Sequence, residues 1–123
     1  MAKILVSEDE PYISKMLEYR LVRLGHEILL ATDGEQALAL VESDHPDLVL
    51  LDVMMPVLGG FQVLRKMKQD DATSGIPVII LSAKGQENDI VTGLEYGAFD
   101  YITKPFSFPE LIARINRALA SID

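Results

Sequence analysis

The chain has 123 residues, of which 49% are hydrophobic and 24% are charged, and it contains no cysteine. These values are ordinary for one globular domain, and the lack of cysteine excludes disulfides and thiolate metal sites. The formal net charge of −8 argues against direct binding of nucleic acid or of an anionic membrane through bulk electrostatics. No apolar stretch approaches the length of a membrane span, and the first residues lack a secretory h-region, so we expect a cytoplasmic protein.

Five short apolar runs are typical of β-strands that are buried on both faces, as in a parallel sheet. They cover residues 3–7, 27–31, 48–52, 77–82 and 99–103. The segments that follow them have apolar residues at the three- and four-residue spacing of an amphipathic helix. The chain therefore alternates strand and helix five times.

The first two helices have recognisable ends. The first is predicted to begin near Pro11 and to stop at Gly25, since proline favours the first turn and glycine follows helix ends. Its apolar stripe, in which arginine is the one polar member, is Ile13, Met16, Leu17, Arg20, Leu21 and Leu24. The second helix starts at Asp33 with Gln36 three residues later, which is a capping-box pattern. Its predicted buried residues are Ala37, Leu38, Leu40 and Val41.

The other three helices are predicted from similar signals. The third follows a glycine pair at positions 59–60. The fourth, over residues 86–96, is weaker because Gly93 interrupts it. The last begins with another capping box, formed by Ser107 and Glu110.

The alternation of strands and helices predicts an α/β fold with a five-stranded parallel sheet and five helices on its two faces. Right-handed crossovers leave a few doubly wound strand orders, of which the flavodoxin-like order 2-1-3-4-5 is the natural choice. That choice is partly an analogy with known doubly wound proteins. We expect one domain over residues 1–123, with the first and third strands adjacent.

Charged side chains follow three of the predicted strands at their carboxyl ends. Glu8 and Asp9 come directly after the first strand, Asp52 closes the third, and Lys104 follows the fifth. Open α/β sheets bind ligands at this edge, where we expect the four groups to converge. Clustered carboxylates need compensation, and Mg²⁺ prefers hard oxygen ligands, so we predict Asp9 and Asp52 as direct Mg²⁺ ligands and Glu8 as a ligand through water. The main-chain carbonyl of Met54 would supply a further oxygen.

A metal beside an exposed carboxylate, with an ammonium opposite, suits phosphoryl transfer, because cations neutralise the negative charge of the transferred group. Asp52 is the candidate nucleophile, since carboxylates form acyl phosphates, and Lys104 would face it. Ser82 ends the fourth strand, so its hydroxyl could donate to a phosphoryl oxygen. The small Ala83 beside it would let a backbone N–H approach as well.

Five segments of the chain resemble the motifs of the receiver domain of two-component response regulators, in the same order and at the family's spacing. They are residues 4–11 (Ile-Leu-Val-Ser-Glu-Asp-Glu-Pro), 48–56 (Leu-Val-Leu-Leu-Asp-Val-Met-Met-Pro), 81–83 (Leu-Ser-Ala), 97–101 (Gly-Ala-Phe-Asp-Tyr) and 103–106 (Thr-Lys-Pro-Phe). The resemblance covers the whole chain and is specific as a set, whereas any one motif alone is weak. It implies a CheY-like fold and a phosphoacceptor switch that assists its own phosphorylation and dephosphorylation, but is not an enzyme.

The resemblance also implies roles for individual residues. Asp52 would take a phosphoryl group from a sensor histidine kinase or a phosphotransfer protein and become an aspartyl phosphate. The two acids after the first strand would form the Mg²⁺ pocket, and Lys104 would contact the phosphoryl group. Ser82 and Tyr101 would form the conformational switch, in which Ser82 moves inward and Tyr101 turns into the vacated space. The Lys104–Pro105 bond would be cis, a form that only X-Pro bonds adopt at modest cost.

This switch would change the surface formed by the fourth helix, the fifth strand and the last helix, which a downstream protein or a fused output domain would read. One transcription-factor subfamily forms dimers through this surface, and Asp100, Glu110 and Arg114 match its charged positions. Ile90 and Phe99 stand where charged partners are expected, so a phosphorylation-dependent homodimer stays an open question. The candidate interface residues are Ile90, Tyr96, Phe99, Asp100, Glu110 and Arg114.

Several alternatives stay open from the residues. Glu8 and Asp9 could simply cap the first helix, Tyr101 could be only a strand aromatic, and Lys104 could be a surface ammonium. A haloacid-dehalogenase-type phosphatase also uses a strand-end aspartate, but it needs an acid where Met54 stands. A flavodoxin-like electron carrier would bind a phosphate that the acids after the first strand repel. The chain could also be a degenerate docking module, or the excised receiver of a DNA-binding or second-messenger-producing regulator.

Two positions bear on how long a phosphoryl group would last. Met54 and Lys84 stand two residues after Asp52 and Ser82, and neither side chain is a carboxylate or amide that orients a hydrolytic water. We therefore predict slow self-dephosphorylation. A phosphoryl half-life of only seconds would contradict this.

Overall fold

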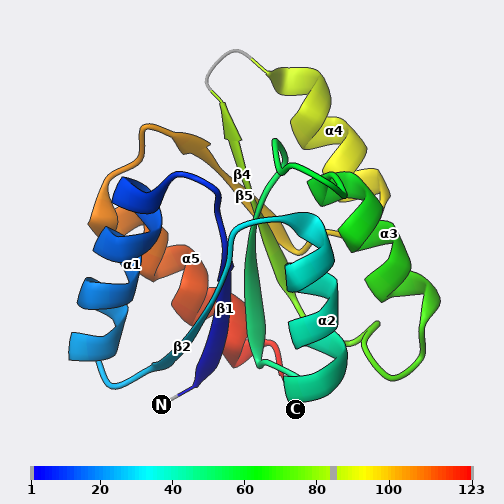
Figure 1. Cartoon of the computed structure of the whole chain (residues 1–123). Coiled ribbons are helices and arrows are strands. Elements are labelled where there is room, and N and C mark those ends of the chain that lie inside the picture. Colours follow the sequence, from blue (N-terminus) through cyan, green and yellow to red (C-terminus); the bar gives the residue numbers. More distant parts are fainter. Residues whose placement is uncertain (1, 84–85, 123) are drawn as a thin grey trace.

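The computed structural model describes residues 2–83 and 86–122, which form a parallel five-stranded sheet between two layers of helices (Figure 1). The strands are β1 (Lys3–Ser7), β2 (Glu27–Ala31), β3 (Leu48–Asp52), β4 (Val78–Ala83) and β5 (Asp100–Lys104). The helices are α1 (Pro11–Arg23), α2 (Gly34–Asp44), α3 (Gly60–Gln69), α4 (Glu87–Glu95) and α5 (Phe108–Ala120). The strands pair in the order β2-β1-β3-β4-β5, so the predicted doubly wound fold is confirmed. Within the described part of the chain, none of the helices combines the length and apolar character needed to cross a lipid bilayer.

Two apolar clusters lie on the two faces of the sheet. On one face, Leu17 of α1 and Ile115 of α5 belong to one cluster with Leu50 of β3. On the other face, Val41 of α2 and Leu64 of α3 belong to the second cluster. Figure 1 shows the same division, with α1 and α5 on one side of the sheet and α2, α3 and α4 on the other. The central strands β1, β3 and β4 are buried on both faces, which explains their nearly continuous apolar sequences.

The last two strands differ from the prediction by one residue. β4 begins at Val78 rather than Pro77, because proline has no N–H to donate to a neighbouring strand, and it ends at Ala83, so the prediction of Ser82 as its last residue was wrong by one position. The carbonyl of Pro77 still accepts a hydrogen bond from the N–H of Val49 at 3.1 Å. β5 extends to Lys104, which lies beside Ala83 in the register of the sheet. The strand therefore carries Lys104 itself to the carboxyl edge.

The two predicted capping boxes mark true helix starts. The Asp33 carboxylate accepts from the N–H of Gln36 at 2.8 Å, which satisfies an amide at the start of α2. The Gln36 side chain returns to Thr32 rather than to Asp33, accepting from the Thr32 N–H at 3.0 Å. At the start of α5, the Ser107 hydroxyl accepts from the N–H of Glu110 at 3.2 Å. Polar side chains thus begin both helices where the sequence indicates.

The first helix departs from its predicted apolar stripe at two positions. Leu24, the last apolar position of the predicted stripe, is the C-cap residue of α1 and is 54% exposed, so it does not take part in the buried face of the helix. Arg20 is also exposed, and its guanidinium carbon lies 4.6 Å from the centroid of the Phe108 ring. An arginine is tolerated in this stripe because its planar head stacks on a ring while staying near water.

Gly93 lies where α4 packs against β4. A Cβ at this position would overlap Cδ1 of Ile80 and would come within 3.4 Å of Cε1 of Phe61. Glycine weakens a helix locally, but here its missing side chain allows α4 to lie directly on the sheet. The interpretation of Gly93 as a simple interruption was therefore incomplete.

Candidate functional site

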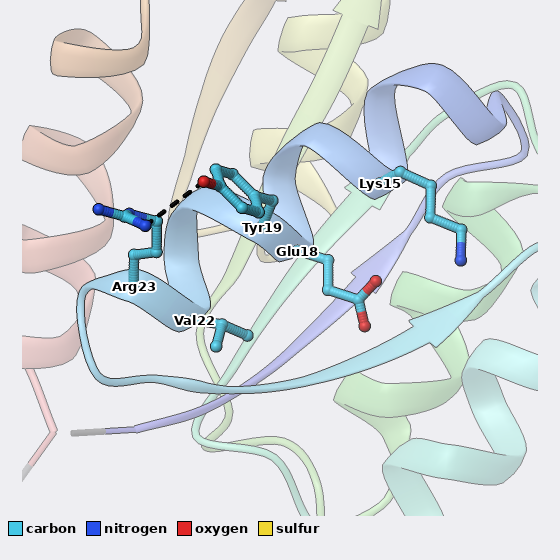
Figure 2. A pocket seen from close by; sticks show the side chains of 5 residues that line it. All are labelled: Lys15, Glu18, Tyr19, Val22 and Arg23. Carbon is cyan, nitrogen blue, oxygen red and sulfur yellow. Dashed lines mark hydrogen bonds between the residues drawn. The ribbon is translucent and has the colours of Figure 1, made fainter.

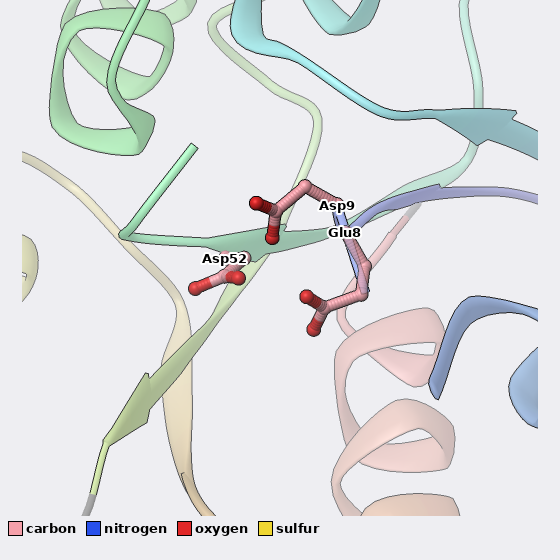
Figure 3. Close-up of side chains that lie close together, drawn as sticks. All are labelled: Glu8, Asp9 and Asp52. Atoms are coloured by element: carbon pink, nitrogen blue, oxygen red, sulfur yellow. The ribbon is translucent and has the colours of Figure 1, made fainter. Parts of the chain in front are cut away.

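Three carboxylates meet at the carboxyl edge of the sheet (Figure 3). Glu8 and Asp9 directly follow β1, and Asp52 is the last residue of β3, which pairs with β1. One carboxylate oxygen from each of the three residues lies within 4.8 Å of the others. Glu8 and Asp52 are buried, with relative exposures of 0% and 4%, whereas Asp9 is exposed. The structure thus brings the three acids together, with Asp9 on the solvent side.

Lys104, at the end of β5, bridges two of these acids. Its Nζ lies 2.6 Å from Oε1 of Glu8 and 3.1 Å from Oδ2 of Asp52. Burial opposes the charge on this ammonium, but the two carboxylates outweigh burial and raise the pKa of Lys104 above its ordinary value. The ammonium therefore stays protonated and offsets part of the negative charge around Asp52. The peptide bond between Lys104 and Pro105 is cis.

Glu8 has an unusual environment for a carboxylate. Burial raises the pKa of Glu8 to about 7, with Lys104 acting in the opposite direction and Asp52 adding to the rise. Its Oε2 accepts from the N–H of Glu10, the N-cap residue of α1, at 3.2 Å, so Glu8 does satisfy one amide at this helix start. Its Oε1 faces Lys104 instead. Capping alone therefore does not account for the position of this side chain.

The loop after Asp52 is held by hydrogen bonds from two sides. Oδ1 of Asp52 accepts from the N–H of Met54 at 3.0 Å. The carbonyl oxygen of Pro56 accepts from the N–H of Leu58 at 2.8 Å and from the N–H of Gly34, the first residue of α2, at 3.2 Å. A Cβ on Gly34 would overlap the carbonyl oxygen of Leu58. The start of α2 therefore supports the loop that carries Met54.

Ser82 and Tyr101 lie on the same face of neighbouring strands. Ser82 follows Ile80 by two residues, and Ile80 lies beside Tyr101 in the register of β4 and β5. Ser82 is buried, and its Oγ has no hydrogen-bond partner among residues 2–83 and 86–122. Tyr101 is half-buried. A buried hydroxyl without a partner is costly, so Ser82 is ready to donate to an acceptor that arrives at the edge. Lys84, considered above for self-dephosphorylation, lies outside the described residues.

Several candidate interface residues are already paired within the chain. Nη1 of Arg114 lies 2.8 Å from Oδ1 of Asp100, and Nη2 lies 3.1 Å from Oε2 of Glu110. Arg117 lies over the ring of Phe99, 5.7 Å from its centroid. Arg117 was not among the predicted interface residues, although its three-residue spacing from Arg114 places both arginines on one face of α5.

The other two candidate interface residues belong to α4 and its end. Ile90 is half-buried, and Tyr96 is 37% exposed. The ring of Tyr96 meets that of Phe61 edge-on, with centroids 6.0 Å apart, and Arg65 lies 5.1 Å from its centroid. One side of the Tyr96 ring therefore contacts α3.

A groove of about 390 Å³ lies along the outer face of α1 (Figure 2). It is lined by Lys15, Glu18, Tyr19, Val22 and Arg23. Tyr19 and Val22 are 64% and 51% exposed, and Nη1 of Arg23 donates to the Tyr19 hydroxyl at 3.3 Å. This mixed aromatic, aliphatic and charged lining suits contact with another protein rather than a chemical step.

Comparisons with known proteins agree with one another. The family model of the response regulator receiver domain matches residues 4–116. The alkaline phosphatase synthesis transcriptional regulatory protein PhoP of Bacillus subtilis is 46% identical over 117 residues, which are 95% of this chain and 48% of that protein. The receiver domain of a Francisella response regulator is similar in structure, with a TM-score of 0.90 and 35% identity over 98% of both chains.

A further similar structure is the receiver domain of a sensor histidine kinase from Pseudomonas aeruginosa, with a TM-score of 0.90 and 32% identity over 98% of both chains. That structure has a magnesium ion coordinated in its active-site cleft. The chain spans about half the length of the curated relatives it matches.

Proposed function

The chain belongs to the response regulator receiver family, and we propose on this basis that it is a phosphoacceptor switch whose residues 1–123 form one receiver domain. Asp52 takes a phosphoryl group from a sensor histidine kinase or a phosphotransfer protein. The observation that carries this proposal is the position of Asp52, which ends β3 next to the acids Glu8 and Asp9 and within 3.1 Å of the Lys104 ammonium. The domain is a signalling switch rather than an enzyme with a substrate of its own.

The reaction uses Asp52 as the nucleophile. One of its carboxylate oxygens forms a bond to phosphorus while the N–P bond of a phosphohistidine breaks, and the imidazole nitrogen keeps that electron pair. Lys104 offsets negative charge on the transferred oxygens, because its Nζ already lies 3.1 Å from Asp52. The Ser82 hydroxyl, which has no other partner in the described residues, donates to one of those oxygens.

The acidic pocket fits a divalent cation such as Mg²⁺. Three carboxylate oxygens within 4.8 Å of one another are hard ligands, and a cation relieves their repulsion. Asp9 and Asp52 would hold the ion directly, Glu8 would act through water, and the main-chain carbonyl of Met54 would add a ligand. A bound ion supplies charge neutralisation to the phosphoryl oxygens. Support comes from this donor set and from the magnesium in the related kinase receiver domain.

Phosphorylation shifts an equilibrium between two conformations of the domain. Ser82 moves toward the phosphoryl group, Tyr101 turns into the space that Ser82 leaves, and the surface of α4, β5 and α5 changes. Because the related PhoP is a transcriptional regulator about twice as long as this chain, we favour a fused output domain that reads this surface. A stand-alone regulator that binds a separate downstream protein is the alternative.

The phosphodonor protein docks across α1, beside the site. The groove of Figure 2 exposes Tyr19 and Val22 on this helix. A cavity of about 130 Å³ between α1 and the segment after β5 is lined by Ile13, Met16, Lys104, Pro105 and Phe106. Apolar groups around a cavity next to a reactive centre are typical of protein contact, and Lys104 lines this cavity and also contacts Asp52.

Two further properties follow from charge. A net charge of −8 supports a domain that binds neither nucleic acid nor membrane itself. A phosphorylation-dependent homodimer through α4, β5 and α5 that used Arg114 across its interface would require this residue to leave Asp100 and Glu110.

The decisive experiment is incubation with Mg²⁺ and acetyl phosphate, followed by mass spectrometry of the intact protein. We expect one added phosphoryl group on the wild type and none on Asp52→Asn. Asp71→Asn, which changes an exposed acid after α3, is the matched control and should behave as the wild type. Beryllium fluoride, a phosphoryl mimic, should shift the NMR signals of Ser82 and Tyr101 only when Asp52 is present. Phosphorylation that survives Asp52→Asn would overturn the assignment.

A further inference from the structure

Each of the five arginines of the chain lies over an aromatic ring. The pairs are Arg20–Phe108, Arg23–Tyr19, Arg65–Tyr96, Arg114–Tyr101 and Arg117–Phe99, with distances from guanidinium carbon to ring centroid between 4.6 and 5.7 Å. The attraction between a guanidinium and the face of a ring favours one arrangement of both groups. The pair Arg114–Tyr101 bears on function directly, because Tyr101 is the proposed switch residue.

Arg114 is fixed by two carboxylates at once. Its Nη1 donates to Oδ1 of Asp100 at 2.8 Å, and its Nη2 donates to Oε2 of Glu110 at 3.1 Å. The same oxygen of Asp100 accepts from the N–H of Tyr101 at 2.8 Å, and Asp100 is only 7% exposed. The backbone of β5 and two acids therefore keep the guanidinium 5.4 Å from the centre of the Tyr101 ring.

The position of α5 determines which orientation of the Tyr101 ring is compatible with the contact to Arg114. α5 packs on the same face of the sheet as α1, whereas Tyr101 packs against the cluster on the opposite face, on the side of Ser82. β5 is an edge strand, so Arg114 reaches Tyr101 around the open edge of the sheet. A ring that turned inward, toward Ser82, would move away from α5 and lose its contact with Arg114.

We propose that Arg114 is a latch that holds the Tyr101 ring in its outward position and thereby opposes the switch. This rests on the proposed function, because it assumes the switch roles of Ser82 and Tyr101. Arg114 acts through Tyr101 and is a positioning residue. Loosening it shifts the ring inward even when no phosphoryl group is present.

The direct test is the orientation of the Tyr101 ring in the unphosphorylated protein, measured by NMR with labelled tyrosine. Arg114→Lys keeps the charge but loses the planar, two-pronged guanidinium. We expect the inward population to rise about two- to five-fold, the range for losing one exposed guanidinium–ring contact. Asp100→Asn, which weakens the anchor of Arg114, should act in the same direction. Arg117→Lys is the matched control, because its ring is Phe99, and it should leave Tyr101 unchanged.

A second measurement is the rate of phosphorylation by acetyl phosphate in a double-mutant cycle. Arg114→Lys should speed phosphorylation in the wild-type background and have no effect in Tyr101→Leu, which lacks the ring. An unchanged ring population in Arg114→Lys, or an equal rate effect in both backgrounds, would overturn the latch. Absence of any phosphorylation at Asp52 would instead overturn the proposed function, and the ring measurement would still decide the role of Arg114.

Discussion

Glu8 and Lys104 form the closer of the two ion pairs at the site: Nζ lies 2.6 Å from Oε1 of Glu8 and 3.1 Å from Oδ2 of Asp52. A glutamate side chain is one methylene longer than an aspartate, and here it reaches the ammonium from a fully buried position. Lys104 is consequently shared between the acidic pocket and the phosphoacceptor. A substitution of Glu8 or Lys104 should therefore change the charge environment of Asp52.

The ionisation of Glu8 should make stability depend on pH when no metal is bound. Burial raises the pKa of Glu8 to about 7, above the value of 4.5 that is ordinary for glutamate. The folded protein holds this proton more tightly than the unfolded chain, so the Glu8 contribution to the free energy of unfolding should fall between about pH 4.5 and about pH 7 and then level off. Urea unfolding in EDTA at about pH 5 and about pH 8 measures this difference.

Glu8→Gln is the matched control for this experiment, because an amide does not titrate. Burial lowers the pKa of His26, which contributes with the opposite sign in both proteins. The difference between the two profiles therefore isolates Glu8. Parallel profiles for wild type and Glu8→Gln would contradict the prediction.

Replacing Lys104 with methionine should leave the buried carboxylates without their ammonium. Glu8 and Asp52 then face each other uncompensated, and we expect a loss of about 1.5–3 kcal/mol of unfolding free energy at about pH 8 without metal. Saturating Mg²⁺ should stabilise Lys104→Met more than it stabilises the wild type. Thermal unfolding with and without Mg²⁺ measures both effects, with Lys66→Met, an exposed position of α3, as the control. Equal stabilisation by Mg²⁺ would argue against this role of Lys104.

Val57, in the loop after Asp52, has a strained backbone. Its φ is +70°, which β-branched residues rarely adopt, and its side chain is 75% exposed. Val57→Gly should raise the free energy of unfolding by about 1 kcal/mol, because glycine accepts positive φ without strain. Val57→Ala retains a Cβ and should gain clearly less. Urea unfolding of the three proteins is the measurement, and a less stable glycine variant would refute this account.

Gly93→Ala should destabilise the protein, although alanine favours helices more than glycine does. The added methyl group overlaps Cδ1 of Ile80, and relieving the overlap should cost about 1–3 kcal/mol. Ile80→Val removes that Cδ1, so the double variant should be more stable than the sum of the single effects predicts. Urea unfolding of all four proteins tests this, and strictly additive effects would show that the overlap is not the cause.

The arrangement of the acids could be predicted because a parallel sheet brings the ends of its strands to one edge. Asp52 closes an apolar run and Glu8 follows another, so their convergence depends only on the strand order. The predicted strand limits near Pro77 and Lys104 were displaced by one residue, because pairing between strands decides them rather than local preference.

Other features depend on contacts between distant segments and leave no local pattern. Glu8 is buried whereas Asp9 is exposed, and only the buried Glu8 lies beside Lys104 among these two acids. Glycine has a low helix propensity, so Gly93 reads from the sequence as a helix interruption. Its role in the packing of α4 follows only from the position of Ile80, which leaves no room for a Cβ. Neither the pairing of Glu8 with Lys104 nor the packing of Gly93 on Ile80 can be inferred from sequence periodicity.

The carbonyl of Pro56 ties the loop after Asp52 to the first turn of α2 through Gly34. Gly60, at the start of α3, lies against the backbone of Asp52 so closely that a Cβ there would overlap it. The loop therefore has a fixed span, and one inserted or deleted residue would displace α2 together with the phosphoacceptor. Among related chains, insertions and deletions should accumulate in other connections, such as residues 70–77 between α3 and β4, and spare the stretch from Asp52 to Gly60.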